Sequence, residues 1–204
     1  YSFSKLSLYQ QCPLRFKFRY IDKIKEQQKY STQLIHGKAL HKTLENVRIN
    51  FLKHQTYSYE ESFEIYNYTI NSIIEKNKKF LINKNPDIDY LKKSARSTLE
   101  WYWENIFPFE DKWEICHIEK NMYAHLSKKY KFIFVPDKLV CKNGTISITD
   151  YKSSYSQEKF CTHHEQMMLY ACLIQWLYPK YTNSIKLKII YLNDKKYFIK
   201  LISW

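Results

Sequence analysis

The sequence contains few glycines and no closely spaced cysteines, and these shortages limit what the protein can be. Its 204 residues include 2 Gly, 5 Pro and 5 Cys. The cysteines at positions 12, 116, 141, 161 and 172 form no Cys-x-x-Cys pair, so they predict no zinc site. Reduced thiols are the default for such a set, and no secretory signal is recognisable, so we expect an intracellular protein. No apolar run reaches the roughly 20 residues of a membrane span, and no membrane partner is expected.

Positive charge and aromatic rings are abundant. The formal net charge is +13, and the chain has 19 Tyr and 12 Phe. A basic, aromatic-rich surface is typical of proteins that bind DNA or RNA. Frequent Lys, Ile, Asn and Tyr also fit an AT-rich genome, in which lysine is common whatever the partner. Composition alone therefore leaves both explanations open.

The first half of the chain is predicted to be mostly helical. Residues 4–20 are expected to form two short helices, with Ser4 as a cap and Pro13 in the first turn of the second. Residues 34–54 carry apolar side chains at helical spacing. Two further helices are expected over 59–82 and 88–106, and Asn85-Pro86 separates them.

The second half changes to strand patterns. Strands are predicted over 113–126, 130–142 and 145–153, a helix over 163–178, and a closing strand pair over 184–193 and 196–204. This order predicts an α/β fold with a mixed central sheet flanked by helices and a helical N-terminal half. We expect one domain over 1–204, with a helical insertion at about 55–110.

A hairpin is expected at Asn143-Gly144, because this dipeptide between two strand runs is a strong turn signal. A turn centred there places Leu139 opposite Ile148 and Asp137 opposite Asp150. Residues two apart share a face of a strand, so Lys152 joins the two carboxylates on one face. Like charges directly opposite one another destabilise a sheet, and burying them unpaired costs several kcal/mol.

Two explanations can offset that cost. A divalent cation such as Mg²⁺ or Mn²⁺ would bind the carboxylate oxygens. Alternatively, Lys152 forms an ion pair with one of the aspartates at a fraying end of the sheet. The hairpin by itself leaves both open.

Five pieces of the sequence, in order, resemble the PD-(D/E)xK nuclease superfamily and most closely its RecB-like branch. That branch includes the AddB nuclease domain and CRISPR-associated RecB-like exonucleases. The pieces span residues 2–170, and they are "SFSKLSLYQQCPLRFKFRYID", "HGKALH", "VPDKL", the "DYK" that is separated from Asp137 by 12 residues, and "QMMLY". The resemblance implies a restriction-endonuclease-like core.

The resemblance also implies roles for particular residues. Asp137 and Asp150 would hold a catalytic metal, with the Tyr151 backbone carbonyl assisting and His41 as a further ligand. Lys152 would position the attacking water and stabilise charge on the phosphate. Gln166 and Tyr170, one helical turn apart, would steady Lys152 or contact the nucleic-acid backbone. Glu119 resembles the acid of the first core strand and is an expected outer-shell ligand.

Ordinary structural roles stay open for several of these residues. Gln166 and Tyr170 also fit the polar edge of an amphipathic helix, and the basic-aromatic run 15–20 fits a surface helix as well as a DNA contact. The resemblance supports no ligand role for His36, His163 or His164.

The chain departs from the family pattern in two places. No glycine precedes Asp137, where the family usually has one. Several relatives bind an iron–sulfur cluster through the cysteine of the N-terminal Cys-Pro and three more near the C terminus. Cys12 matches the first, but beyond Tyr170 only Cys172 occurs, and the usual cluster needs four thiolates. We therefore expect no cluster in this chain.

These residues predict a DNA nuclease that depends on Mg²⁺ or Mn²⁺, and the resemblance favours an exonuclease on single strands or free ends. The resemblance further suggests a helicase or CRISPR-type protein partner. The alternative is a non-catalytic or partner-activated nucleic-acid-binding subunit. Loss of the site usually removes an Asp or the Lys, whereas this chain retains all of them, which favours the enzyme.

Overall fold

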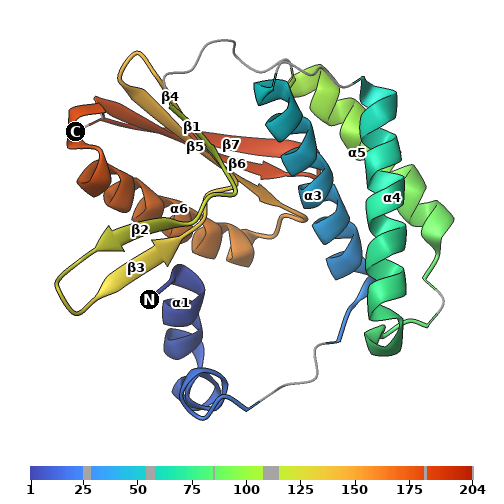
Figure 1. Cartoon of the computed structure of the whole chain (residues 1–204), viewed down its shortest axis with the longest axis horizontal. Helices are drawn as coiled ribbons and strands as arrows, with labels where there is room; N and C mark the ends of the chain where they lie inside the picture. Colours follow the sequence, from blue (N-terminus) through green and yellow to red (C-terminus); the bar gives the residue numbers. More distant parts are fainter. Residues whose placement is uncertain (25–28, 54–57, 85, 108–114, 182, 204) are drawn as a thin grey trace.

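The computed structural model describes residues 1–24, 29–53, 58–84, 86–107, 115–181 and 183–203. A five-stranded sheet lies at the centre, with a layer of three long helices beside it and one long helix on its other side (Figure 1). The helices are α1 (Phe3–Gln11), α2 (Pro13–Phe16), η1 (Lys17–Ile21), α3 (Thr32–Leu52), α4 (Tyr59–Asn77), η2 (Lys78–Phe80), α5 (Ile88–Asn105), α6 (Gln157–Leu177) and η3 (Pro179–Tyr181). The strands are β1 (Ile115–Ile118), β2 (Met122–His125), β3 (Lys131–Phe134), β4 (Lys138–Lys142), β5 (Thr145–Lys152), β6 (Ser184–Tyr191) and β7 (Lys196–Ser203).

The long N-terminal helices form where the sequence placed them, and each begins at a side-chain cap. Ser31 accepts from the backbone of Leu34 at the start of α3, and Ser58 with Glu61 forms a capping box on α4. The predicted cap at Ser4 is wrong. The first helix begins at Phe3, and the Ser2 hydroxyl accepts from the Lys5 backbone. Within the described residues, no helix is long and apolar enough to span a membrane.

The strand prediction is correct in type but wrong in number before α6. The sheet order is β1-β4-β5-β6-β7, and β2 with β3 forms a separate hairpin. The run expected at 113–126 is divided at Glu119, whose φ of 46° leaves the extended region; residues 113–114 lie outside the described part. The run at 130–142 is divided at Pro136, which has no N–H for a ladder. Helix α6 also begins earlier than expected, at Gln157 after the cap Ser156.

The β4–β5 register is the predicted one. Leu139 pairs with Ile148 and Lys138 with Thr149, on either side of the turn at Asn143-Gly144. Both turn residues have positive φ, 49° and 72°, as a two-residue hairpin of this class requires. Strand β5 runs parallel to β6, and all other neighbours in the sheet are antiparallel. The predicted mixed sheet flanked by helices is therefore confirmed.

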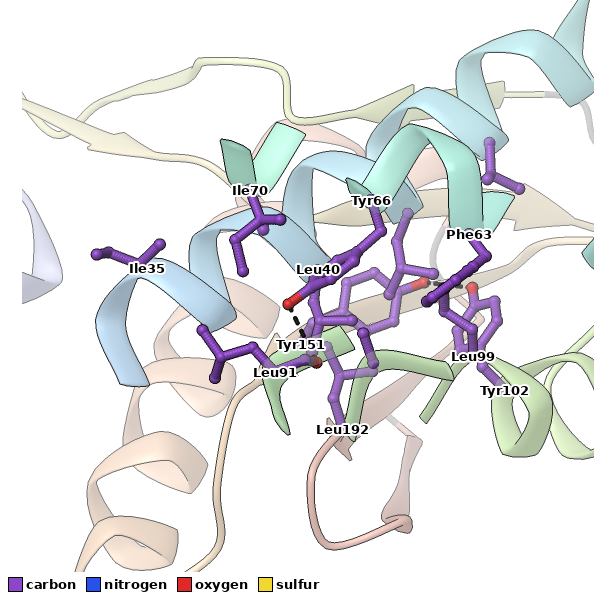
Figure 2. Packing of buried hydrophobic residues seen from close by; sticks show 14 of the residues in the cluster. Ile35, Leu40, Phe63, Tyr66, Ile70, Leu91, Leu99, Tyr102, Tyr151 and Leu192 are labelled. Carbon is purple, nitrogen blue, oxygen red and sulfur yellow. Dashed lines mark hydrogen bonds between the residues drawn. The ribbon is translucent and has the colours of Figure 1, made fainter. Parts of the chain in front are cut away.

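Two hydrophobic clusters hold these layers together and meet at β5. One joins α3, α4 and α5 to the C-terminal ends of β5 and β6, and its members include Leu40, Tyr66, Leu99 and Tyr151 (Figure 2). The other joins the opposite face of the sheet to α6 and the β2–β3 hairpin, and includes Leu139, Ile148 and Met167. Ile146 and Ile148 of β5 thus enter one cluster and Tyr151 enters the other, so the end of β5 lies between helices from both halves of the chain.

Candidate active site

The β4–β5 hairpin ends in a cluster of charged side chains. Asp137 directly precedes β4, and its Oδ2 accepts a hydrogen bond from the Tyr151 backbone N–H. Asp150 is 4% exposed, and its Oδ2 lies 2.7 Å from Lys152 Nζ. Among the described residues this Oδ2 atom has no hydrogen-bond donor of good geometry, and the lysine charge lies beside it. The ion pair that was one explanation of the hairpin exists, but it uses Asp150 and leaves the Asp137 carboxylate to other partners.

Helix α3 brings His41 to this cluster. The His41 Nδ1 atom lies 3.8 Å from Asp137 Oδ2. Gly37, one turn earlier, allows this approach, because a Cβ there would lie 3.3 Å from the Cβ of Ser153, directly after β5. A larger residue would push α3 away from the end of β5. The glycine of "HGKALH" therefore places the helix, and its second histidine enters the site.

Glu119 completes a group of metal-binding side chains. It follows β1, and its backbone N–H donates to the Asp137 carbonyl at 3.3 Å. One ligand atom each from His41, Glu119 and Asp137 lie within 4.8 Å of one another. Two carboxylates and an imidazole suit a divalent cation such as Mn²⁺ or Mg²⁺. Asp150 lies outside this trio and faces Lys152, so Glu119 is closer to the ligand group than the sequence suggested.

Burial and mutual repulsion shift the pKa values of these side chains, and a bound cation would offset the repulsion between the carboxylates. Burial raises the pKa of the Asp137 carboxyl well above its usual range, and the charges of Asp150 and Glu119 raise it further. Burial likewise raises the pKa of Glu119, although its hydrogen bond to Asp137 opposes the shift. Burial lowers the pKa of His41, which favours the neutral imidazole that binds metals. The donor set fits a divalent cation.

Helix α6 contributes a polar chain to Lys152. Lys152 Nζ donates to Gln166 Oε1 at 3.1 Å, and Gln166 Nε2 donates to the Tyr170 hydroxyl at 2.8 Å. Burial raises the pKa of Tyr170, so its hydroxyl stays protonated. These contacts bring together the two helix residues and the lysine that the sequence singled out.

Of the histidines for which no ligand role was expected, His36 lies away from the charged cluster and His163 lies close to it. His36 is buried between the Tyr66 hydroxyl, at 2.7 Å, and the Asn193 side chain, at 3.2 Å. His163 on α6 is near the site: burial lowers its pKa to about 4, and the Lys152 charge adds to the shift. Its Nδ1 lies 2.9 Å from the Tyr191 hydroxyl, so it packs against the site as a neutral ring.

A buried network that sequence reasoning missed anchors the centre of the motif. The Arg48 guanidinium donates to the Tyr102 hydroxyl at 3.0 Å, and that hydroxyl lies 2.9 Å from the hydroxyl of Tyr151 (Figure 2). Tyr151 stands between Asp150 and Lys152, so its side chain fixes the backbone that carries both. Arg48 sits among apolar residues on the same face of α3, and no local pattern indicates a partner 54 residues away.

An open cleft of about 450 Å³ gives access to the site. His41, Glu119 and Asp137 line it, together with Lys38 and Lys42 from α3. A cation and a phosphate group can therefore reach the carboxylates of Glu119 and Asp137 from solvent. The two lysines add positive charge to the wall of the same cleft.

Comparisons with known proteins show the family of the chain but not the geometry of its site. No curated relative matches the chain at a significant level. Among solved structures, the crystal structure of SSO0001 is similar over 95% of this chain and 76% of its own, at 14% sequence identity and a TM-score of 0.32. That likeness is too weak to support a conclusion. A sequence model of the PD-(D/E)XK nuclease superfamily, in contrast, matches residues 1–200. The chain therefore belongs to the PD-(D/E)XK nuclease superfamily, whose members are metal-dependent nucleases.

Proposed function

We propose that the protein is a DNA nuclease of the RecB-like branch that degrades DNA from free ends. The observation that carries this proposal is the end of the β4–β5 hairpin, where the Asp150–Lys152 ion pair lies beside Asp137, and Asp137 and His41 line an open cleft. The superfamily accounts for the nuclease chemistry, and the N-terminal Cys-Pro and "HGKALH" elements favour the branch.

We assign the metal site to His41, Glu119 and Asp137, whose ligand atoms lie within 4.8 Å of one another, with Asp150 and the Tyr151 carbonyl as further ligands. A bound Mg²⁺ or Mn²⁺ would act as a Lewis acid and lower the pKa of a water molecule. The imidazole of His41 favours Mn²⁺ over Mg²⁺, because nitrogen ligands suit transition metals. We expect no iron–sulfur cluster.

The roles of the remaining residues follow from their contacts. Lys152 Nζ, 2.7 Å from Asp150, is a fixed positive donor that can hydrogen-bond the attacking water and stabilise the negative charge that develops on the phosphate. Gln166 accepts from this ammonium and restricts it to one orientation, while Tyr170 holds the Gln166 amide. The pair therefore positions the lysine without touching the reacting atoms.

The cellular setting is proposed on the same basis. An intracellular location, a role in DNA repair, and action beside a helicase or CRISPR-type partner all fit the branch resemblance. A partner-activated subunit remains the competing function, and the experiment below separates it from an autonomous nuclease.

The test is cleavage of end-labelled linear DNA, circular DNA and RNA in Mn²⁺, Mg²⁺ or EDTA. We expect metal-dependent loss of linear DNA, resistance of the circle, and no cleavage by Asp150→Ala or Lys152→Ala. Lys93→Ala, an exposed lysine on α5, is the matched control and should cleave like the wild type. Cleavage of circles would refute the exonuclease, and preferred cleavage of RNA would refute the DNA specificity. Unchanged DNA binding without cleavage in any metal would favour the partner-activated subunit.

A further inference from the structure

A second groove, larger than the catalytic cleft, runs between α3 and α4. Its volume is about 640 Å³. The two helices lie side by side along their length (Figure 1). The lining residues used below are Lys42 and Asn46 from α3, and Tyr68, Ser72, Lys76 and Asn77 from α4. None of them belongs to the motifs described above.

The groove joins the catalytic cleft at Lys42. This residue lines both spaces, and it directly follows His41. Its ammonium is held 2.7 Å from Glu45, which lines the cleft. An extended ligand whose phosphate lies at Asp137 therefore has a path past Lys42 and into the groove.

The chemistry of the lining fits a nucleic-acid strand. Lys42 and Lys76 can pair with phosphates, and the amides of Asn46 and Asn77 can donate and accept at sugars and base edges. Tyr68 is 78% exposed, so its ring is available for a base to stack on. Glu64, the acid in the lining, precedes Lys76 by 12 positions, which places it about 18 Å away along α4.

The width selects a single strand. The axes of two packed helices lie about 8–10 Å apart, and the valley between the helices is no wider than this distance. A DNA duplex is wider than this valley, because its major groove by itself is about 12 Å wide. One extended strand can lie in such a valley, but a duplex would rest across its rim.

We propose that the α3–α4 groove binds single-stranded nucleic acid on one side of the scissile phosphate. This inference rests on the proposed function for its substrate, but it concerns a separate binding surface. The Tyr68 ring stacks on a base, Lys76 contacts a phosphate, and Lys42 directs the strand into the catalytic cleft.

Binding in EDTA tests the groove without catalysis. The probe is a fluorescently labelled oligothymidylate of about 12 nucleotides, compared with one of about 3, and anisotropy is the readout. We expect Tyr68→Ala to weaken binding of the longer probe about 30-fold, the middle of the range for one stacked base. Lys76→Ala should reduce the slope of log K against log[salt] by about 0.7, the value for one phosphate contact on a single strand. The shorter probe, which cannot fill cleft and groove together, should bind all variants alike.

Matched controls come from α5, whose exposed residues do not line the groove. Tyr90→Ala removes a tyrosine that is 67% exposed, and Lys93→Ala removes an exposed lysine. Both should bind the longer probe like the wild type. Thermal melting of each variant confirms that it is folded.

The outcomes separate this inference from the proposed function. If Tyr68→Ala and Lys76→Ala bind the longer probe like the wild type while the wild type cleaves DNA, the groove has another occupant and the inference fails, but the nuclease stands. Equal weakening of a blunt duplex would refute the single-strand assignment. If no DNA is cleaved in any metal, the nuclease proposal fails, and the anisotropy series still decides the groove.

Discussion

Replacing Tyr102 with Phe removes a hydroxyl that two buried groups share. That hydroxyl accepts from Arg48 at 3.0 Å and lies 2.9 Å from the Tyr151 hydroxyl. A neutral buried hydrogen bond contributes about 1 kcal/mol, and one to a charged group about 1.5–3 kcal/mol. Tyr102→Phe should therefore lower the free energy of unfolding by about 3 kcal/mol.

Arg48→Met provides the decisive comparison. It removes the buried cation but leaves the two tyrosine hydroxyls bonded to each other, and the methionine fills much of the same space. We expect a loss of about 1 kcal/mol, less than for Tyr102→Phe, because no charged donor loses a partner inside the protein.

Urea unfolding followed by circular dichroism measures both variants. A difference of about 2 kcal/mol corresponds to a shift of about 1 M in the midpoint. Tyr90→Phe, on an exposed ring, should match the wild type. If Arg48→Met proves the more destabilising change, the guanidinium itself is the stabilising group, and the reasoning from shared hydroxyls is refuted.

Four further predictions concern the site. Lys152→Ala should lower kcat by about 10²–10³ without reducing the rise in Tm that Mn²⁺ produces; reduced metal binding would assign the lysine to the metal site instead. Mn²⁺ at 100 times its Kd should stabilise the wild type by about 2.7 kcal/mol, measured as a Tm shift, and Asp137→Asn should abolish that shift. Gly37→Val should lower activity about 100-fold by moving His41. Gly37→Ala should change the free energy of unfolding by less than about 1 kcal/mol. If Gly37→Val is as active as the wild type, the 3.3 Å contact with Ser153 is unimportant. Because the His163 pKa is lowered from 6.5 to about 4 in the folded protein, its contribution to stability is present above pH 6.5 and lost as pH falls toward 4, so His163→Gln should flatten that part of a stability–pH curve.

Much of the site could be predicted because its geometry is local. Asn143-Gly144 fixes the register, which pairs Lys138 with Thr149 and so brings the next residues along, Asp137 and Asp150, to the same end of the hairpin. Likewise, the four-residue spacing of Gln166 and Tyr170 puts them on one face of a helix. These relations depend on a turn and on a helical period, both of which can be read from neighbouring residues.

The features that were predicted incompletely or not at all depend on contacts between distant segments. Glu119 was expected only as an outer-shell ligand, and it joins the ligand group because β1 pairs with β4 and Glu119 itself takes a left-handed conformation, which is rare for a non-glycine residue. The Arg48–Tyr102–Tyr151 network joins α3, α5 and β5, and a lone arginine in an amphipathic helix indicates none of these partners. The division of the strand predicted over 130–142 has a local cause at Pro136, but the strong β-propensity of the surrounding residues favoured one continuous strand.

Lys152 and a cation compete for the same carboxylate. Asp150 Oδ2 is buried, accepts no hydrogen bond from the described residues and lies 2.7 Å from the lysine charge, whereas the carboxylates of Asp137 and Glu119 repel each other. A cation bound by the His41–Glu119–Asp137 trio would be attracted to Asp150 and repelled by Lys152. At an effective dielectric constant near 20, each of these interactions changes the free energy of metal binding by a few kcal/mol. Removing the lysine should therefore strengthen metal binding while it weakens catalysis. That opposition is the reason to measure both on Lys152→Ala, because a lysine that only maintained the fold would lower the two together.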